Sequence, residues 1–154
     1  MMTDFRIKKL RLPVALVMLG GEELNGEMFV QTLSPLRHGP EEIPDILNSD
    51  EPFFPLARAG GTLLVAKDQV REVVITGEAL DAPFVESAAR HESVEVTLTD
   101  GTVRTGKVYL EMPAERPRLL DFLNRYAQRF VVLYAAGGVC LVNRTLIEHV
   151  RPVE

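Results

Sequence analysis

Residues 94–108 read VEVTLTDGTVRTGKV, and this stretch decides the fold. Its first half alternates apolar and polar residues, which is the period of a strand with one buried face. Asp100-Gly101 follows at once, and this pair favours a tight hairpin turn because glycine adopts positive φ without a steric penalty. After the turn a second strand alternates again, with Val108, Leu110 and Met112 between the residues at 107, 109 and 111. The stretch therefore predicts an antiparallel hairpin with one apolar face.

The chain beyond this hairpin changes its period and then returns to strands. Apolar residues of the segment 117–128 recur at i, i+3, i+4 and i+7, which places them on one face of a helix. Three further strands are predicted at 130–134, 139–143 and 147–151. The order strand, strand, helix, strand, strand, strand favours a small, strongly bent β-barrel.

An earlier part of the chain repeats this pattern in the same order. Gly21 and Gly26 correspond to Gly101 and Gly106, and matching apolar residues continue to the end of both segments. We therefore expect an internal duplication, and such a repeat determines the whole fold. The predicted divisions are an N-terminal basic segment at 1–12, a first repeat at 13–75, a linker at 76–92 and a second repeat at 93–154.

Composition sets limits on the class of protein. The chain has 154 residues, a formal net charge of −5 and a single cysteine. A negative balance argues against duplex binding, and one cysteine allows no internal disulfide. The sequence shows no signal peptide and no apolar run long enough to cross a bilayer, so we expect a cytoplasmic protein without a membrane partner.

The first strand of the first repeat is apolar on both faces. Ala15, Val17 and Leu19 stand where the second repeat has Glu95, Thr97 and Thr99. A strand with this pattern is covered on both sides. The three residues are therefore a candidate apolar interface. The cover is expected from the linker, with Phe84 and Val85, from the second repeat, or from another subunit.

Charge is divided unevenly between the two repeats. Residues 13–75 hold four Lys or Arg and ten Asp or Glu, whereas residues 93–154 hold eight and seven. This division is typical of a solvated helix face with local ion pairs, or of a surface that docks an acidic partner such as the first repeat of a neighbouring molecule. Four arginines lie in or beside the predicted second helix and are candidate partner or nucleic-acid contacts: Arg116, Arg118, Arg125 and Arg129.

Each repeat resembles the Sm-like family of small β-barrels. The family's first motif is an alternating strand, an Asp-Gly turn and a strand beginning Gly-x-apolar, as in 94–108; its second motif, an apolar strand, tight turn and short last strand, matches 63–73 and 140–150. The resemblance implies a mainly β chain of two tandem Sm-like or SH3-like barrels. It also implies oligomers, because Sm-like proteins usually form rings.

The chain departs from the family in two respects. The family's helix precedes the first strand, whereas the helix predicted here follows the second strand of each repeat. The family's RNA pocket uses an Asp/Asn pair and an Arg-Gly turn. In the corresponding last turns this chain has Lys67 and Arg144, without the glycine. Lys67, Asn143 and Arg144 are therefore candidate partner or RNA contacts, and the resemblance implies the fold more than it implies RNA binding.

Motifs of catalysis and metal binding are not found in the sequence. His38, His91 and His149 stand in no ligand spacing, and no phosphate-binding glycine loop or nucleophile elbow occurs. We expect no enzyme, no cofactor and no metal. The expected function is a protein-interaction or assembly module that associates with itself or with another protein. An RNA- or single-strand-binding protein is the alternative, and a receptor for a small ligand such as a nucleotide second messenger is the third.

Overall fold

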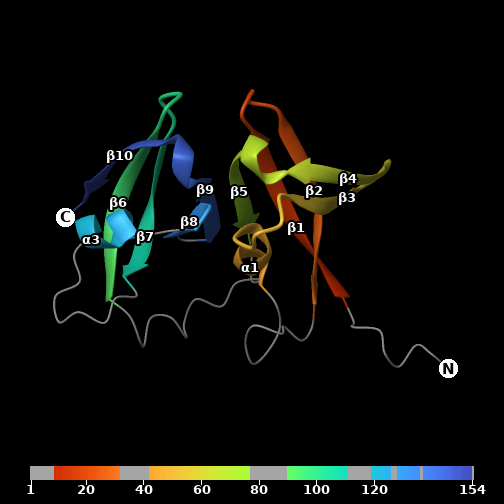
Figure 1. Cartoon of the computed structure of the whole chain (residues 1–154), viewed down its shortest axis with the longest axis horizontal. Helices are drawn as coiled ribbons and strands as arrows, with labels where there is room; N and C mark the ends of the chain where they lie inside the picture. Colours follow the sequence, from red (N-terminus) through yellow and green to blue (C-terminus); the bar gives the residue numbers. More distant parts are fainter. Residues whose placement is uncertain are drawn as a thin grey trace. The chain divides into compact units, whose positions relative to one another are not determined.

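The computed structural model describes residues 9–31, 42–76, 90–110, 119–125, 128–135 and 137–153. In this part of the chain the regular structure is mainly β, as the sequence predicts, with ten strands and two short α-helices (Figure 1). The chain divides into two compact units, Met1–Val73 and Val74–Glu154. None of the helices in the described ranges is long and apolar enough to span a membrane.

The first unit has the predicted order of elements. They are β1 (Lys9–Met18), β2 (Glu23–Gln31), α1 (Ile43–Leu47), β3 (Phe53–Arg58), β4 (Gly61–Ala66), the 3-10 turn η2 (Lys67–Gln69) and β5 (Val70–Thr76). The last strand, β5, crosses the boundary between the units. The strands of the first unit lie side by side in the order β5-β1-β2-β3-β4.

The second unit repeats this order. Its elements are β6 (Arg90–Leu98), β7 (Val103–Leu110), α3 (Leu119–Arg125), β8 (Phe130–Ala135), β9 (Gly138–Asn143), the 3-10 turn η4 (Arg144–Leu146) and β10 (Ile147–Pro152). Its strand order is β10-β6-β7-β8-β9. Among the described residues the strand order ends at β10 and at β4, so the antiparallel sheet is open and does not show the closed barrels expected from the sequence.

The first hairpin of each unit has the same register. Val14 pairs with Gly26 in β1–β2, and Val94 pairs with Gly106 in β6–β7. The first unit requires a glycine at residue 26 of this pair. A Cβ atom on Gly26 would lie 2.6 Å from the carbonyl oxygen of Ala57 in β3, a distance that side chains do not tolerate. Glycine therefore lets β3 approach β2 closely at this point.

The helices follow from local sequence rules. In α1, proline stands in the first turn and Glu42 forms a capping box with Asp45, whose carboxylate accepts the Glu42 backbone N–H at 2.8 Å. Ile43 and Leu47 are buried on its inner face. In α3, Leu119 is buried, and Phe122 and Leu123 pack against the same core as the i, i+3, i+4 spacing predicts.

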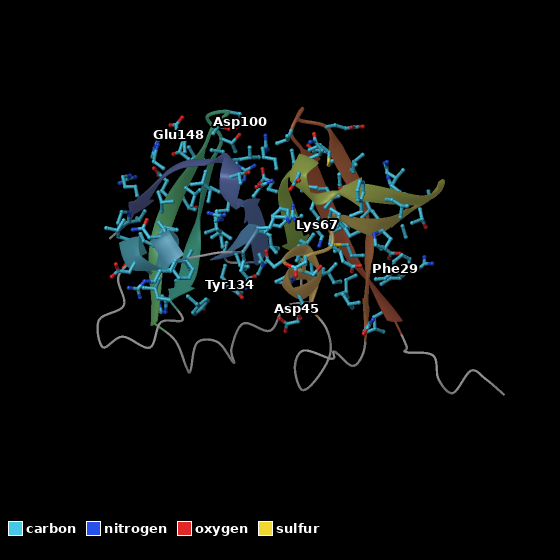
Figure 2. The ribbon with its side chains drawn as sticks, viewed as in Figure 1. Phe29, Asp45, Lys67, Asp100, Tyr134 and Glu148 are labelled. Carbon is cyan, nitrogen blue, oxygen red and sulfur yellow. The ribbon has the colours of Figure 1, made fainter. Side chains whose placement is uncertain are left out.

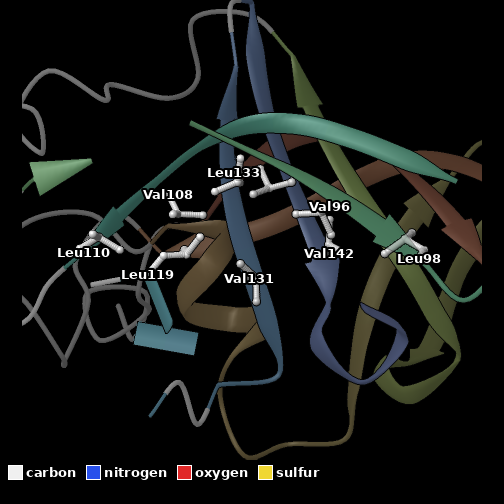
Figure 3. Close-up of a cluster of buried hydrophobic side chains, with 9 residues drawn as sticks. Val96, Leu98, Val108, Leu110, Leu119, Val131, Leu133 and Val142 are labelled. Carbon is white, nitrogen blue, oxygen red and sulfur yellow. The ribbon is translucent and has the colours of Figure 1, made fainter. Parts of the chain in front are cut away.

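The core of the second unit is a cluster of apolar side chains from four of its strands and its helix. Nine buried side chains come from β6, β7, α3, β8 and β9 (Figure 3). Leu133 of this cluster is fully buried, and the alternate residues Val94, Val96 and Leu98 supply the β6 side. The alternation that predicted the strand in the sequence is therefore the same alternation that builds the core.

Two predicted boundaries fall beside the observed ones. β1 begins at Lys9, within the predicted N-terminal segment 1–12, and β6 begins at Arg90, within the predicted linker 76–92. The expected cover by Phe84 and Val85 lies outside the described residues.

Candidate functional site

The hairpin of β3 and β4 (residues 53–66), here called the β3–β4 hairpin, is the most exposed apolar element that the structure describes. Its ladder has six pairs, from Phe53 opposite Ala66 to Arg58 opposite Gly61. Gly61 has a φ of 129°, a value open to glycine, and this allows the tight return of the chain. Directly opposite residues share one face of a ladder, so the pairs assign each side chain to a face.

The two faces of the β3–β4 hairpin are both apolar but differ in burial. On the inner face Phe54 and Leu56 are buried in the core of the first unit. On the outer face Phe53 is 57% exposed and Leu64, opposite an exposed Pro55, is 73% exposed. We call Phe53, Pro55 and Leu64 the apolar outer face. Exposed apolar residues that lie together in this way indicate a contact surface.

The corresponding positions of the second unit are buried. In the β8–β9 ladder Phe130 lies opposite Asn143, and Leu141 lies opposite Val132, in the same register as Phe53–Ala66 and Leu64–Pro55. Phe130 and Leu141 are both 0% exposed. The β3–β4 and β8–β9 hairpins have the same register but differ in exposure. The outer face is buried in β8–β9 and exposed to solvent in β3–β4.

β4 is also an edge strand. It pairs with β3 on one side and stands at the end of the strand order, with no further strand beside it among the described residues. The outward N–H and C=O groups of an edge strand form a ready template for a strand from another chain. Leu63, opposite Leu56 on the inner face, is 41% exposed because it lies at this edge. The surface can therefore offer backbone hydrogen bonds and apolar contact together.

Charged residues mark the two ends of the β3–β4 hairpin. Exposed Asp50 and Glu51 precede Phe53, and exposed Asp68 follows Ala66, so three carboxylates belong to one end of the ladder. Arg58 stands at the other end, where its Nε donates to the carbonyl oxygen of Asn25 at 3.2 Å. The surface is therefore polarised, with an acidic end.

The apolar interface predicted from the first strand is less exposed than this hairpin. Ala15 and Val17 are half-buried on β1, opposite Asn25 and Glu23. Leu19 is 44% exposed and lies in the turn after β1, where its N–H donates to the carbonyl oxygen of Gln69 at 2.9 Å. Sequence reasoning missed the outer face of the hairpin, although FFPLA at 53–57 and LLVA at 63–66 show the same doubly apolar pattern.

Lys67 lies in the interior of the first unit and is labelled in Figure 2. Its side chain is fully buried. The ammonium Nζ donates to the Ile46 carbonyl oxygen at 2.6 Å, to Ser49 Oγ at 2.9 Å and to the Ser49 carbonyl oxygen at 3.3 Å. This lysine satisfies carbonyl groups at the end of α1, so it is not a surface contact for a partner or for RNA.

Asn143 is also a structural residue. It is 2% exposed, and its Oδ1 accepts the backbone N–H of Thr145 at 3.1 Å and the Thr145 hydroxyl at 2.8 Å. It therefore fixes the turn η4. The following residue, Arg144, is exposed, and its Nε donates to the carbonyl oxygen of Gln128 at 3.1 Å.

The remaining basic candidates are only partly gathered by the fold. Arg129 is half-buried, and its carbonyl oxygen accepts the backbone N–H of Arg144 at 2.9 Å, so these two arginines are neighbours. Arg125 is exposed at the end of α3. Arg116 and Arg118 lie outside the described residues. With Lys67 and Asn143 buried, Arg144 is the exposed one of the three turn candidates, and of the helix candidates Arg129 lies beside it.

The described ranges contain no group of three or more His, Cys, Asp or Glu placed to hold a metal ion. His91 packs its ring against Tyr109, with 5.7 Å between ring centroids, and His149 Nδ1 lies 3.1 Å from the Glu148 carboxylate.

Comparison with known proteins finds no family model, no curated protein and no solved structure that matches this chain.

Proposed function

We propose that the chain is a non-enzymatic protein-interaction and assembly module, and that the β3–β4 hairpin is its docking surface. The observation that carries the proposal is that the Leu64 side chain is 73% exposed on the edge strand β4. In the described residues the backbone of β4 pairs with β3 on one side. Full burial of one such side chain contributes roughly 1.5–3 kcal/mol, so Leu64 and Phe53 together can anchor a contact.

The mode of docking is strand addition along β4. An added strand receives backbone hydrogen bonds from the edge, and its alternate side chains meet the faces of the hairpin. On the outer face these side chains would meet Leu64 and Phe53. The partner is a second copy of the chain or another protein.

We also propose that the two units arose by duplication and that each is a small, barrel-like fold. The shared order of elements and the shared register at Gly26 and Gly106 support the duplication. The resemblance to Sm-like barrels supports the fold. Both helices, α1 and α3, follow the second strand of their unit rather than preceding the first, which sets this chain apart from the family's pattern.

A retention experiment tests the docking surface. The chain, its Leu64→Ser variant and a Leu10→Ser control would each be immobilised and exposed to a lysate of the native cell. Leu10 is the matched control because it is an exposed leucine of the same unit that lies on β1, outside the hairpin. We expect at least one protein to be retained by the wild type and by Leu10→Ser but lost with Leu64→Ser. Identical retention by all three would contradict the proposal.

A further inference from the structure

We propose that the β3–β4 hairpin docks a basic, extended segment of another protein, which adds antiparallel to β4 with its basic residues N-terminal to its apolar ones. This inference rests on the proposed docking function and names the chemistry of the partner. The site is the edge strand with its apolar outer face, and the charges around it select the occupant.

The two edge strands of the described sheet are protected to different degrees. β10 carries exposed Glu148 and Arg151, ends at Pro152, and has a register shift in its pairing with β6. Charged side chains, proline and bulges are devices that keep a foreign strand away from an edge. β4 has none of them, because its six residues are uncharged and pair with β3 in an unbroken register. Of the two edges, β4 is therefore the one that accepts a strand of another chain.

A strand added beside β4 meets apolar side chains on both faces of the sheet. Leu64, 73% exposed, lies on the outer face, and Leu63, 41% exposed, lies on the inner face. Successive side chains of the added strand alternate between these two faces. A segment that covers both leucines therefore has apolar residues at neighbouring positions, which is the pattern of a strand covered on both sides.

Acidic side chains gather at one end of the β3–β4 hairpin. The Lys67 N–H donates to the Pro52 carbonyl oxygen at 2.8 Å, and this bond joins the chain before β3 to the chain after β4. Glu51 precedes Pro52 and Asp68 follows Lys67, so the bond holds two exposed carboxylates at the same end. Exposed Asp50 is next in the chain to Glu51. A bound segment is therefore expected to place basic residues at this end.

The opposite end of the hairpin carries a positive charge, which fixes the orientation of the segment. Exposed Arg58 stands there, opposite Gly61, and it disfavours a basic residue of the partner. β4 reaches the acidic end at Ala66, its last residue. An antiparallel segment places its N-terminal residues beside Ala66, and antiparallel pairing is slightly the more stable arrangement. The basic residues therefore precede the apolar run.

The charge of the first repeat favours another protein over a second copy of this chain. Residues 13–75 hold ten Asp or Glu and four Lys or Arg, a formal balance of −6. Two such repeats repel each other as they approach, whereas a basic segment is attracted. The occupant is therefore assigned to a protein of different sequence.

Fluorescence anisotropy with two labelled octapeptides tests the inference on the full chain. Lys-Lys-Val-Leu-Val-Leu-Ser-Ser has its lysines before the apolar run, and Ser-Ser-Val-Leu-Val-Leu-Lys-Lys has them after it. Both have neutral blocked ends, so they are equal in composition and net charge. At low salt we expect the first peptide to bind at least about fivefold more tightly, because each exposed ion pair contributes modestly. The preference should almost vanish at about 1 M salt, where screening is strong.

Two matched double variants separate the acidic end from charge in general. Asp50→Asn with Glu51→Gln removes two exposed carboxylates at that end, and Glu22→Gln with Glu23→Gln removes two at the start of β2. We expect the first pair to lower the preference between the peptides by about twofold or more, and the second pair to leave it unchanged. Leu64→Arg should weaken both peptides by at least about tenfold, as loss of a central anchor does. Circular dichroism checks that each variant keeps the fold.

Equal binding of the two peptides, or tighter binding of the peptide with trailing lysines, would overturn the inference. Dissociation constants weaker than about 1 mM for both peptides would do the same. Light scattering identifies the competing occupant, because a dimer that Leu64→Arg abolishes would assign the edge to a second copy instead. In each of these cases the proposed docking function is decided separately, by whether the lysate experiment yields a Leu64-dependent partner.

Discussion

The ammonium of Lys67 donates a hydrogen bond of 2.6 Å to the carbonyl oxygen of Ile46, near the end of α1. This bond joins the turn between β4 and β5 to a helix about twenty residues earlier in the chain, and Ser49 supplies two further acceptors. A helix of five residues is too short to be stable by itself, so its position depends on such contacts.

Replacement of Lys67 by Met is expected to destabilise the first unit by about 2 kcal/mol, because partly buried acceptors of Ile46 and Ser49 lose their charged donor. Urea denaturation followed by circular dichroism measures the change. Arg144→Met is the matched control, since this exposed residue occupies the same turn of the second unit, and it should cost about 1 kcal/mol or less. Equal losses in the two variants would contradict the role given to Lys67.

Alanine at Gly26 is expected to be more harmful than alanine at Gly106. The added methyl group would lie 2.6 Å from the carbonyl oxygen of Ala57 at the first site, but 3.1 Å from its nearest neighbours at the second. Overpacking costs about 1–3 kcal/mol, and we expect Gly26→Ala near the upper end and Gly106→Ala near the lower. Thermal melting of the two variants checks the order, and a reversed order would show that β3 does not approach β2 as described.

The burial contrast between the hairpins predicts unequal effects of one substitution. Leu141→Ala removes a fully buried side chain and should cost about 2–5 kcal/mol. Leu64→Ala, at the same position of the other ladder, should change the stability of a dilute chain by about 0.5 kcal/mol or less. Denaturation at low protein concentration keeps self-association out of the measurement. Similar costs at both positions would show that the two outer faces are equally covered in solution.

Single-stranded RNA is expected not to bind. Lys67 and Asn143 are buried, and the chain carries a net charge of −5, so the described surface offers few phosphate contacts. Fluorescence anisotropy with labelled oligo-U and oligo-A at low salt measures this directly. Binding that weakens steeply as salt is added would instead favour a nucleic-acid function, with Arg144 and Arg129 as the first residues to test.

Local patterns in the sequence predicted the elements of the fold well. These patterns depend only on residues that are close together in the sequence. The structure has a strand at the alternating residues 94–98, a turn at Asp100-Gly101 and a helix where Leu119, Phe122 and Leu123 have helical spacing. The order strand, strand, helix, strand, strand, strand is confirmed in both units.

The candidate site was harder to predict because burial depends on distant parts of the chain. Phe53 and Phe130 are the same residue type in the same local pattern, yet one is exposed and the other is fully buried. In the sequence, Lys67 has the features of a surface cation. In the structure it donates to backbone oxygens of residues 18 and 21 positions away, and backbone acceptors leave no motif in the sequence. Exposure, rather than pattern, distinguishes the apolar outer face from the core.

The common register of the two first hairpins also affects how the chain reaches its native state. Because Val14–Gly26 and Val94–Gly106 occupy the same place in ladders of similar length, β1 and β6 can each fit the other's partner strand while both units are unfolded. Synthesis on the ribosome delivers β1 and β2 before β6 exists, so the correct pairs form first. Refolding from denaturant releases all four strands at once, and exchange of strands between the units then competes with native pairing.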